Sequence, residues 1–461
     1  MNDCLVQYYR CPARYVRFAP KGPLSPASGY FQFGEGVICY GSYHGRQTAD
    51  VPTGALHDAV RDIVIQDGTT YLPFDPSQVA DNLRCELYVS DWRLGKPWSA
   101  FAKAYYFIRP VLPVGVRKYL QKLRLRGWDK LPFPSWPVDC SVENLFGRLL
   151  LLAVKSNKGE RIPFIWFWPE GSSSAAIMTH DVETELGRTL CSTLMDINDS
   201  YRIKASFQIV PENRYVVSPQ FLSSIRERGF EVAVHDLNHD GHLYRDRDQF
   251  LERAAKINSY GKEYGAEGFR AGVLYRKQLW YDALELSYDM SVPNVAHLDP
   301  QRGGGCTVMP YFVGKILELP VTTTQDYSLF HILGDYSIAL WKRQMEIIMG
   351  KHGLISFIVH PDYMVTSRER GIYESLLAHL DRLRKEKHVW IATPGEVNRW
   401  WRQRAKMTLV EDSNGCHIEG PGSDRARIAY ASEVEGRLTL TLEARPEQGT
   451  SAVKCESGNV T

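Results

Sequence analysis

The stretch Phe230-Glu-Val-Ala-Val-His-Asp-Leu-Asn-His239 places two histidines, His235 and His239, four residues apart at the end of a short apolar strand. An earlier apolar run ends in Ile177-Met-Thr-His-Asp-Val-Glu183. Parallel strands bring their carboxyl ends to the same edge of a sheet. Two imidazoles and a carboxylate at that edge would make three protein ligands with open positions, which is typical of a catalytic divalent metal.

Strands and helices alternate regularly around these motifs, over residues 166–404. Short apolar runs are followed by amphipathic segments of helical length. The predicted strands cover 175–179, 205–210, 231–234, 268–270, 291–295, 316–320, 354–359 and 389–392, and the main predicted helices cover 187–199, 219–228, 247–264, 337–349 and 369–385. Seven or eight such units predict an α/β fold, a parallel (β/α) barrel with its active site at the carboxyl ends of the strands.

The two flanking regions differ from this central region in composition and in predicted secondary structure. Residues 1–165 are rich in Pro, Gly and aromatics and predict an accessory α+β region, with strands at 29–33 and 36–40 and a helix at 141–154. Residues 405–461 predict a small β module with a frayed tail from 448 onward. Its expected strands, separated by Asn-Gly, Pro-Gly and Glu-Gly turns, cover 407–410, 416–419, 427–431 and 438–442.

Composition indicates an ordinary globular protein, with 44% hydrophobic and 23% charged residues in a chain of 461. The net charge of +2 gives no reason to expect a nucleic-acid partner. The nine cysteines are scattered and contain no CxxC pair, so we expect free, mostly buried thiols. Neither a secretory signal nor a membrane-spanning run is evident, which predicts a cytoplasmic location.

The predicted strand ends carry a series of motifs in a fixed order. They read Thr179-His-Asp-Val-Glu, His235-Asp-Leu-Asn-His, Gly268-Phe-Arg-Ala-Gly and Ile358-Val-His-Pro-Asp. This series, within residues 172–400, resembles the polysaccharide deacetylases of carbohydrate esterase family 4, which include chitin and peptidoglycan deacetylases. The resemblance implies a distorted (β/α)7-8 barrel. It also implies a hydrolase that acts on non-peptide carbon–nitrogen bonds, removing N-acetyl groups from a sugar or polysaccharide.

The resemblance also implies roles for individual residues. Asp181 matches the general base, Arg270 the arginine that keeps this base ionised, and His360 the histidine that protonates the leaving amine. His235 and His239 match the metal histidines. The best match to the aspartate that tunes the acid histidine is Asp326 in Thr324-Gln-Asp-Tyr, and this match is weak.

The sequence departs from the family pattern in two of these motifs. The usual metal-binding second aspartate is replaced by Val182. Because side chains alternate along a strand, Glu183 shares a face with Asp181 and is the expected third metal ligand. The third motif lacks its usual Pro-Tyr, and the backbone amide that helps hold the oxyanion in the family would fall near Val273. The implied cofactor is a divalent metal, Zn2+ first, with Ni2+ or Co2+ as alternatives.

Each site residue also has a plainer interpretation. The two histidines could be hydrogen-bonded loop residues, the two carboxylates could sit at a helix N-terminus, Arg270 could form a surface ion pair, and His360 could bond a backbone carbonyl. His242, His297 and Asp240 match no motif and are expected to be solvated loop residues. The run Gly303-Gly-Gly is expected in a flexible active-site loop.

The expected partner is an N-acetylated glycan, an exopolysaccharide or a lipid-linked precursor. Segment 105–128 mixes aromatic, apolar and basic residues, which would suit a peripheral membrane contact or, as we favour, a solvated helix packed on the barrel. Two other functions stay open. One is hydrolysis of a cyclic amide or another non-peptide C–N bond on the same barrel, and the other is an inactive glycan-binding or assembly protein. The sequence does not indicate the oligomeric state.

Overall fold

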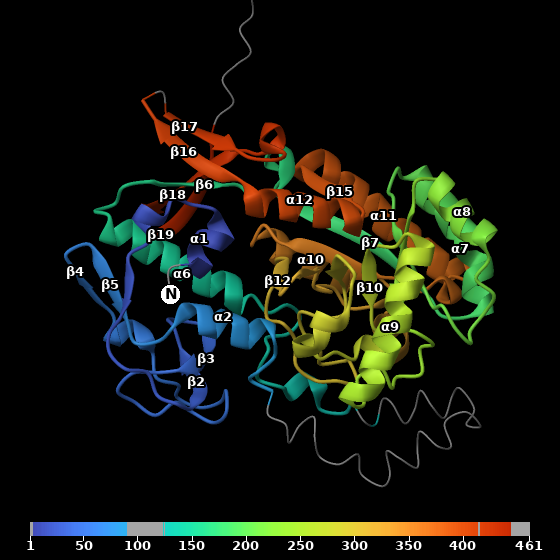
Figure 1. The fold of residues 1–461 in the computed structure, drawn as a ribbon, viewed down its shortest axis with the longest axis horizontal. Helices are drawn as coiled ribbons and strands as arrows, with labels where there is room; N and C mark the ends of the chain where they lie inside the picture. The colour runs from blue at the N-terminus through green and yellow to red at the C-terminus, as the bar shows by residue number, and fades with distance from the viewer. Residues whose placement is uncertain (1–2, 90–122, 124, 414, 444–461) are drawn as a thin grey trace, which may run out of the picture.

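The structure is a computed structural model that describes residues 3–89, 123, 125–413 and 415–443 (Figure 1). In the figure, the elements from β7 to α12 occupy one side of the molecule. The N-terminal elements lie beside them, and the C-terminal strands lie at the top. The tail 448–461 and residues 105–122 and 124 of the aromatic and basic segment lie outside the described residues.

A nine-stranded sheet forms the centre of the region from residue 166 to 404. Its order is β12-β13-β11-β10-β9-β8-β7-β14, with β15 also paired to β7. Neighbouring strands run parallel except for β12 and β13. The strands are β7 (Ser174–Val182), β8 (Ser206–Ile209), β9 (Glu231–His235), β10 (Gly268–Arg270), β11 (Tyr288–Asp289), β12 (Tyr311–Val313), β13 (Ile316–Glu318), β14 (Leu354–Ile358) and β15 (Val389–Ala392).

The sheet curls into a distorted barrel, as the strand pattern predicted. The segment after β13 reaches across to β14, where the Thr323 N–H donates to the Ser356 carbonyl at 3.2 Å and the Ser356 N–H donates to Thr322 Oγ1 at 2.9 Å. The long strand β7 carries β14 on one edge and divides its other edge between β15 and β8. All nine residues of β7 are buried, because helices cover it.

Five barrel helices agree with the predicted ones to within about two residues at each end, and α12 is an additional helix that was not among the predictions. Each of α7, α8, α9, α11 and α12 begins after a Thr, Ser or Asp whose side chain accepts a backbone N–H of the first turn. The helices are α7 (Glu185–Ser200), α8 (Pro219–Glu227), α9 (Arg247–Tyr264), α10 (Ala339–Met349), α11 (Ser367–Lys387) and α12 (Pro394–Lys406).

One predicted strand is wrong. Residues 291–295 do not form a ladder strand, because their sheet pairing is reduced to a single bridge between Pro293 and Val321. Proline has no N–H to donate to a ladder. The strand of this unit is instead the two-residue β11, whose residues Tyr288 and Asp289 pair with β10 and β13.

The N-terminal region contains two small sheets, one of which packs through β5 on helix α6 and the other through β3 on helix α2. Strands β1, β5 and β4 form one sheet, and β2 and β3 form a hairpin. The apolar face of α6 carries Leu145, Leu149 and Val154, all fully buried. The elements are α1 (Asp3–Tyr9), β1 (Phe18–Pro20), β2 (Ser28–Gln32), β3 (Ile38–Ser42), β4 (Val64–Gln66), β5 (Thr69–Leu72), α2 (Pro76–Arg84), α6 (Ser141–Ser156) and β6 (Ile162–Ile165).

The four predicted C-terminal strands are present as β16 (Thr408–Asp412), β17 (Gly415–Glu419), β18 (Ile428–Val434) and β19 (Arg437–Leu442). β16 and β17 form a hairpin, whereas β18 pairs with β6 from the N-terminal region on one edge and with β19 on the other. The two flanking regions therefore share a sheet, and the division of the chain at residues 165 and 404 stays a prediction.

Within the described residues, each helix is too short or too polar to cross a bilayer. The eight cysteines in this part of the chain are free thiols, and five of them, Cys11, Cys39, Cys140, Cys191 and Cys306, are buried. The free thiols agree with the prediction made from the scattered cysteines.

Candidate metal and catalytic site

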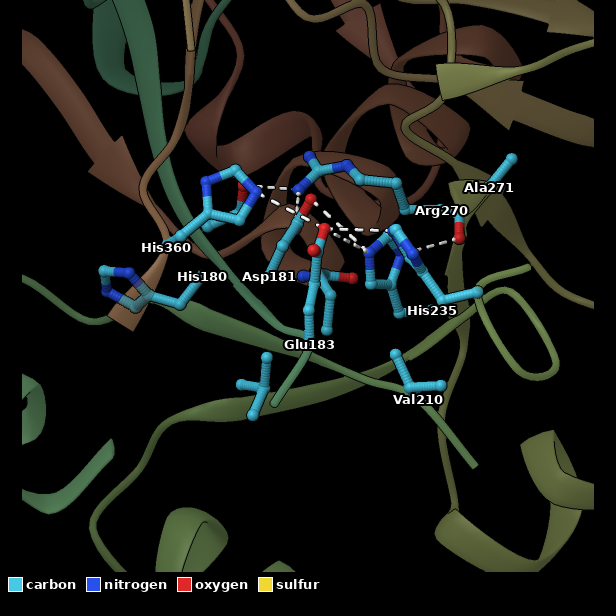
Figure 2. A network of polar contacts seen from close by, with 12 residues as sticks. His180, Asp181, Glu183, Val210, His235, Arg270, Ala271 and His360 are labelled. Atoms are coloured by element: carbon cyan, nitrogen blue, oxygen red, sulfur yellow. Dashed lines mark hydrogen bonds and ion pairs between the residues drawn. The ribbon is translucent and has the colours of Figure 1, made fainter. Parts of the chain in front are cut away.

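Five polar side chains converge at the carboxyl ends of four barrel strands (Figure 2). Asp181 lies on β7, and Glu183 is the first residue after that strand. His235 ends β9, Arg270 ends β10, and His360 follows β14. These strands lie close together in the order β10-β9-β8-β7-β14, with β8 between β9 and β7, and the parallel pairing and curl of the sheet bring the five side chains together. This is the edge of the barrel at which the sequence predicted the site.

Glu183, His235 and His239 form a set of potential metal ligands whose donor atoms all lie within 4.8 Å of one another. Oε1 of Glu183 lies 3.0 Å from Nε2 of His239 and 3.6 Å from Nε2 of His235. Both Nε2 atoms are buried and form no hydrogen bond of regular geometry, and each lies next to the Glu183 carboxylate. The alternative interpretation of two hydrogen-bonded loop histidines does not account for a carboxylate that faces both rings.

The orientation of the His235 ring indicates that a cation would suit this site. Its Nδ1 lies 3.1 Å from the carbonyl oxygen of Arg270, which can only accept, so Nδ1 carries the proton. Nε2 then presents a lone pair toward the carboxylates of Glu183 and Asp181, at 3.6 and 3.7 Å. A lone pair that faces two carboxylates in a buried site requires positive charge between them. A divalent cation held by one carboxylate and two imidazoles fits this donor set.

Glu183 and His239 perturb each other strongly. Burial acts to raise the pKa of Glu183, but His239 and the neighbouring histidines bring it well below its ordinary value. Burial acts to lower the pKa of His239, and Glu183 outweighs this effect, so the pKa lies above its ordinary value. The carboxylate therefore stays ionised and draws a cation or a proton to the site.

Asp181 is held by a buried arginine. Nη1 of Arg270 donates to Oδ1 of Asp181 at 2.5 Å and to Oγ1 of Thr179 at 2.8 Å, and Nε donates to the Met290 carbonyl. Burial acts to raise the pKa of Asp181, but Arg270 and then the nearby histidines lower it below its ordinary value. Arg270 is fully buried, so the alternative of a surface ion pair is wrong.

Asp326 holds His360, which lies on the side of Glu183 opposite to His235 (Figure 2). Its Nδ1 lies 2.6 Å from Oδ1 of Asp326, its backbone N–H donates to Oδ2 at 2.7 Å, and its Nε2 lies 3.5 Å from Glu183. Burial acts to lower the pKa of His360, but Asp326 raises it well above its ordinary value. The weak sequence match at Asp326 thus falls on the residue that contacts the candidate acid.

His180, next to Asp181 in sequence, points away from the site (Figure 2). It is fully buried, with Nδ1 3.1 Å from the Val359 carbonyl and Nε2 3.3 Å from both Asn198 and Tyr373. Burial lowers its pKa to about 4. His180 is therefore a neutral core residue.

The chain after Arg270 passes directly against one of the candidate metal ligands, His239. A Cβ on Gly272 would lie 2.4 Å from Oδ2 of Asp236 and 3.0 Å from the ring of His239, so only glycine fits there. The next two residues, Val273 and Leu274, have left-handed φ angles of 60° and 53°. Each of these conformations costs roughly 1–3 kcal/mol for a non-glycine residue and has to be held by its surroundings. The role of Val273 in binding an oxyanion stays a prediction.

Several residues at the site were not anticipated from the sequence. Thr179 supports Arg270, and Arg214 donates to the carbonyls of Asn238 and His239 at 3.1 and 2.5 Å. The Tyr363 ring lies 5.0 Å from that of His360. Tyr363 could have been suspected from the sequence, because it closely follows the strand-end histidine His360. Arg214 could not, because an arginine in a surface loop shows no recognisable pattern.

Of the three residues expected to be solvated, two fit that expectation and one does not. His242 is half exposed, and Asp240 is partly exposed and paired with Arg253 at 2.8 Å. His297 is only 1% exposed and stacks on Trp136, so its assignment to solvent is wrong.

No protein-family model matches this chain, and no curated protein matches it. Several solved structures are similar to it. The chain is similar to a protein assigned to the polysaccharide deacetylases from Mycobacterium smegmatis, at 19% identity and a TM-score of 0.42 over 52% of this chain and 93% of that one. It is also similar to the peptidoglycan deacetylase PdaC from Bacillus subtilis, at 11% identity and a TM-score of 0.32 over 50% and 93% of the two chains.

A third similar structure is a family 4 acetyl xylan esterase from Clostridium thermocellum in complex with a cobalt ion. Identity is 15% and the TM-score 0.30, over 49% of this chain and 91% of that one. The sequence motifs resemble the same group of enzymes.

Proposed function

We propose that this protein is a metal-dependent hydrolase that removes N-acetyl groups from a sugar or polysaccharide. The observation that carries the proposal is the pairing of Asp181 and His360 around Glu183. Arg270 and the nearby histidines push the pKa of Asp181 below its ordinary value, and Asp326 pushes the pKa of His360 above its ordinary value. Two groups with pKa values moved apart in one site are suited to act as base and acid.

Each group has a distinct task in the proposed reaction. A divalent cation held by Glu183, His235 and His239 would polarise a carbonyl group and make water more acidic. Oδ1 of Asp181 is occupied by Arg270, so Oδ2 is the atom that accepts a proton from the attacking water. Nε2 of His360 faces the site and donates a proton to the departing nitrogen, while Nδ1 stays bound to Asp326.

The substrate class rests on the sequence resemblance. An N-acetylated glycan is the proposed substrate, as an exopolysaccharide or a lipid-linked precursor. Zn2+ is the first candidate metal because one carboxylate and two imidazoles with open positions suit it, and Co2+ or Ni2+ would also be bound by these ligands. The fully buried Asp181 and Arg270 support an enzymatic function, since a protein that only bound glycans would have no use for this costly pair.

The test combines metal analysis with acetate release. Purified protein is analysed for bound metal and then incubated with N-acetylglucosamine oligomers. We expect about one equivalent of metal and release of acetate. The His235→Ala, His239→Ala double variant should lose the metal, whereas Asp181→Asn and His360→Gln should keep it and lose activity. His242→Ala, which removes a half-exposed histidine close to the motif, is the matched control and should change neither property.

The possible outcomes separate the alternatives. Absence of metal after reconstitution would overturn the proposed mechanism. Bound metal without acetate release from any N-acetylated glycan would move the assignment to another C–N bond, such as that of a cyclic amide.

A further inference from the structure

A carboxylate from outside the barrel reaches into its catalytic face. Glu86 follows α2 in the N-terminal region, and its side chain is only 8% exposed. Its two oxygens pair with the guanidinium of Arg276, with Nε of Arg276 donating to Oε2 at 2.7 Å and Nη2 donating to Oε1. The side chain of Arg276 is completely buried. A two-point pair between buried groups fixes both side chains in position.

Arg276 also makes a hydrogen bond to the loop that lies beside the proposed metal ligands. Its Nη1 donates to the carbonyl oxygen of Leu274 at 2.9 Å. Leu274 and Val273 are the two residues of this loop with left-handed backbone, and a Cβ on Gly272 before them would lie 3.0 Å from the ring of His239. The strained loop Gly272–Leu274 thus lies close to His239 at one end and accepts a hydrogen bond from Arg276 at the other.

Glu86 also holds a second loop of the same face. Oε1 accepts the backbone N–H of Gly304 at 2.6 Å. A Cβ on Gly303 would lie 2.5 Å from Oε1 of Glu86, so the glycine run admits the carboxylate and a larger residue would displace it. The close approach of Glu86 therefore explains the glycine at 303, whereas a Cβ on Gly304 would instead meet the Asn294 carbonyl oxygen at 2.3 Å.

We propose that Glu86 is a positioning residue for catalysis. Through Arg276 it keeps the loop Gly272–Leu274 in the conformation that presents its backbone to the reacting acyl group. This inference rests on the proposed function, because it assigns a catalytic use to that loop. It also gives the N-terminal region a role in the reaction that the barrel alone does not supply.

A purely structural role has to be separated from a positioning role. Glu86→Gln leaves the buried charge of Arg276 uncompensated, so this variant loses stability as well as loop position. The double variant Glu86→Gln, Arg276→Met removes the buried charge and is expected to recover stability. It still lacks the donor to the Leu274 carbonyl. Low activity in a double variant of recovered stability would therefore report loop position alone.

The control comes from the same N-terminal segment. Tyr88 donates its hydroxyl proton to the Gly304 carbonyl at 2.7 Å but makes no hydrogen bond to Arg276 among the described residues. Tyr88→Phe removes this bond and the one that the hydroxyl accepts from the Cys306 thiol, and it leaves the hydrogen bonds from Arg276 to Glu86 and to the Leu274 carbonyl intact. It should keep the wild-type kcat.

Three measurements test the proposal on the full-length protein: kcat and KM with N-acetylglucosamine oligomers, bound metal, and amide hydrogen exchange of peptides covering 271–276. In both Glu86 variants we expect kcat to fall about tenfold to a hundredfold, the loss typical of a misplaced catalytic group, with little change in KM or metal content. Exchange within 271–276 should be faster in both variants and unchanged in Tyr88→Phe.

Wild-type exchange and wild-type kcat in the double variant would overturn the proposal. If the wild-type protein releases no acetate, the proposed function fails on its own account, and the exchange measurement still decides whether Glu86 positions the loop.

Discussion

Oδ1 of Asp326 lies 2.6 Å from Nδ1 of His360, while Oδ2 of the same carboxylate accepts the backbone N–H of His360 at 2.7 Å. One side chain therefore fixes both the ring and the backbone of the candidate acid. Asp326 is fully buried, so water does not screen this contact. The arrangement directs Nε2 of His360 toward Glu183 and favours the protonated ring.

Replacing Asp326 with Asn should move the alkaline limb of the pH–rate profile to lower pH. Asp326 holds the pKa of His360 above its ordinary value of 6.5, so the proton-donating form persists above pH 6.5 in the wild type. Without the carboxylate, burial dominates and lowers this pKa. We expect the measured kcat at pH 8 to fall by about a hundredfold and to be partly restored toward pH 6.

Asp335→Asn is the matched control for this change, because Asp335 follows on the same stretch of chain and has no contact with His360 in the structure. An unchanged alkaline limb in Asp326→Asn would contradict the assignment of His360 as the acid.

Replacing Arg270 with Met should act on the acidic limb instead. Arg270 lowers the pKa of Asp181 against the effect of burial, so its loss lets that pKa rise. The base would then be protonated in mildly acidic solution, and activity should fall more at pH 5 than at pH 8. Breaking this buried pair should also cost about 3–5 kcal/mol of stability, so rates are compared well below the unfolding temperature. Equal losses at the two pH values would show that Arg270 does not control the ionisation of Asp181.

Removal of the metal should lower thermal stability in a way that depends on the two histidines. A ligand at a hundred times its Kd stabilises the folded state by about 2.7 kcal/mol. Scanning calorimetry of the metal-loaded protein with and without a chelator should therefore show a lower Tm with chelator. The His235→Ala, His239→Ala variant should show no response. A chelator effect of equal size in that variant would place the metal elsewhere.

The parallel strands and their polar ends could be predicted from the sequence because each strand is a local apolar run and its functional residue follows directly. Asp181, Glu183, His235, Arg270 and His360 all belong to this class. Parallel pairing of neighbouring strands then brings them together without further information.

Asp326 and Glu86 could not be placed in the same way. Asp326 begins a short helical segment with no periodic sequence pattern around it, and its partner His360 follows much later in the chain. Glu86 pairs with Arg276 from a different region, and neither residue stands out among the charged residues of the sequence. Contacts between distant irregular segments depend on the packed fold, which local patterns do not encode.

The sheet shared by the two flanking regions predicts where stability can be lost without loss of chemistry. Ala429 on β18 is fully buried and pairs with Phe164 of β6. Ala429→Asp would bury an unpaired carboxylate and should lower Tm sharply, while kcat measured at low temperature stays near the wild-type value. Val434→Asp, at the 52% exposed end of the same strand, is the control and should leave Tm nearly unchanged. A large loss of kcat in folded Ala429→Asp protein would contradict this separation.

The pairing of β6 with β18 also bears on how the protein is made. During translation β6 leaves the ribosome long before β18, and the proposed metal ligands and catalytic residues are all synthesised between them. At ordinary translation rates the delay is on the order of tens of seconds. The nascent chain can thus complete its metal site while Ile162-Pro-Phe-Ile165 is still an unpaired apolar edge. We expect this strand to be the segment that a chaperone binds before the last strands emerge.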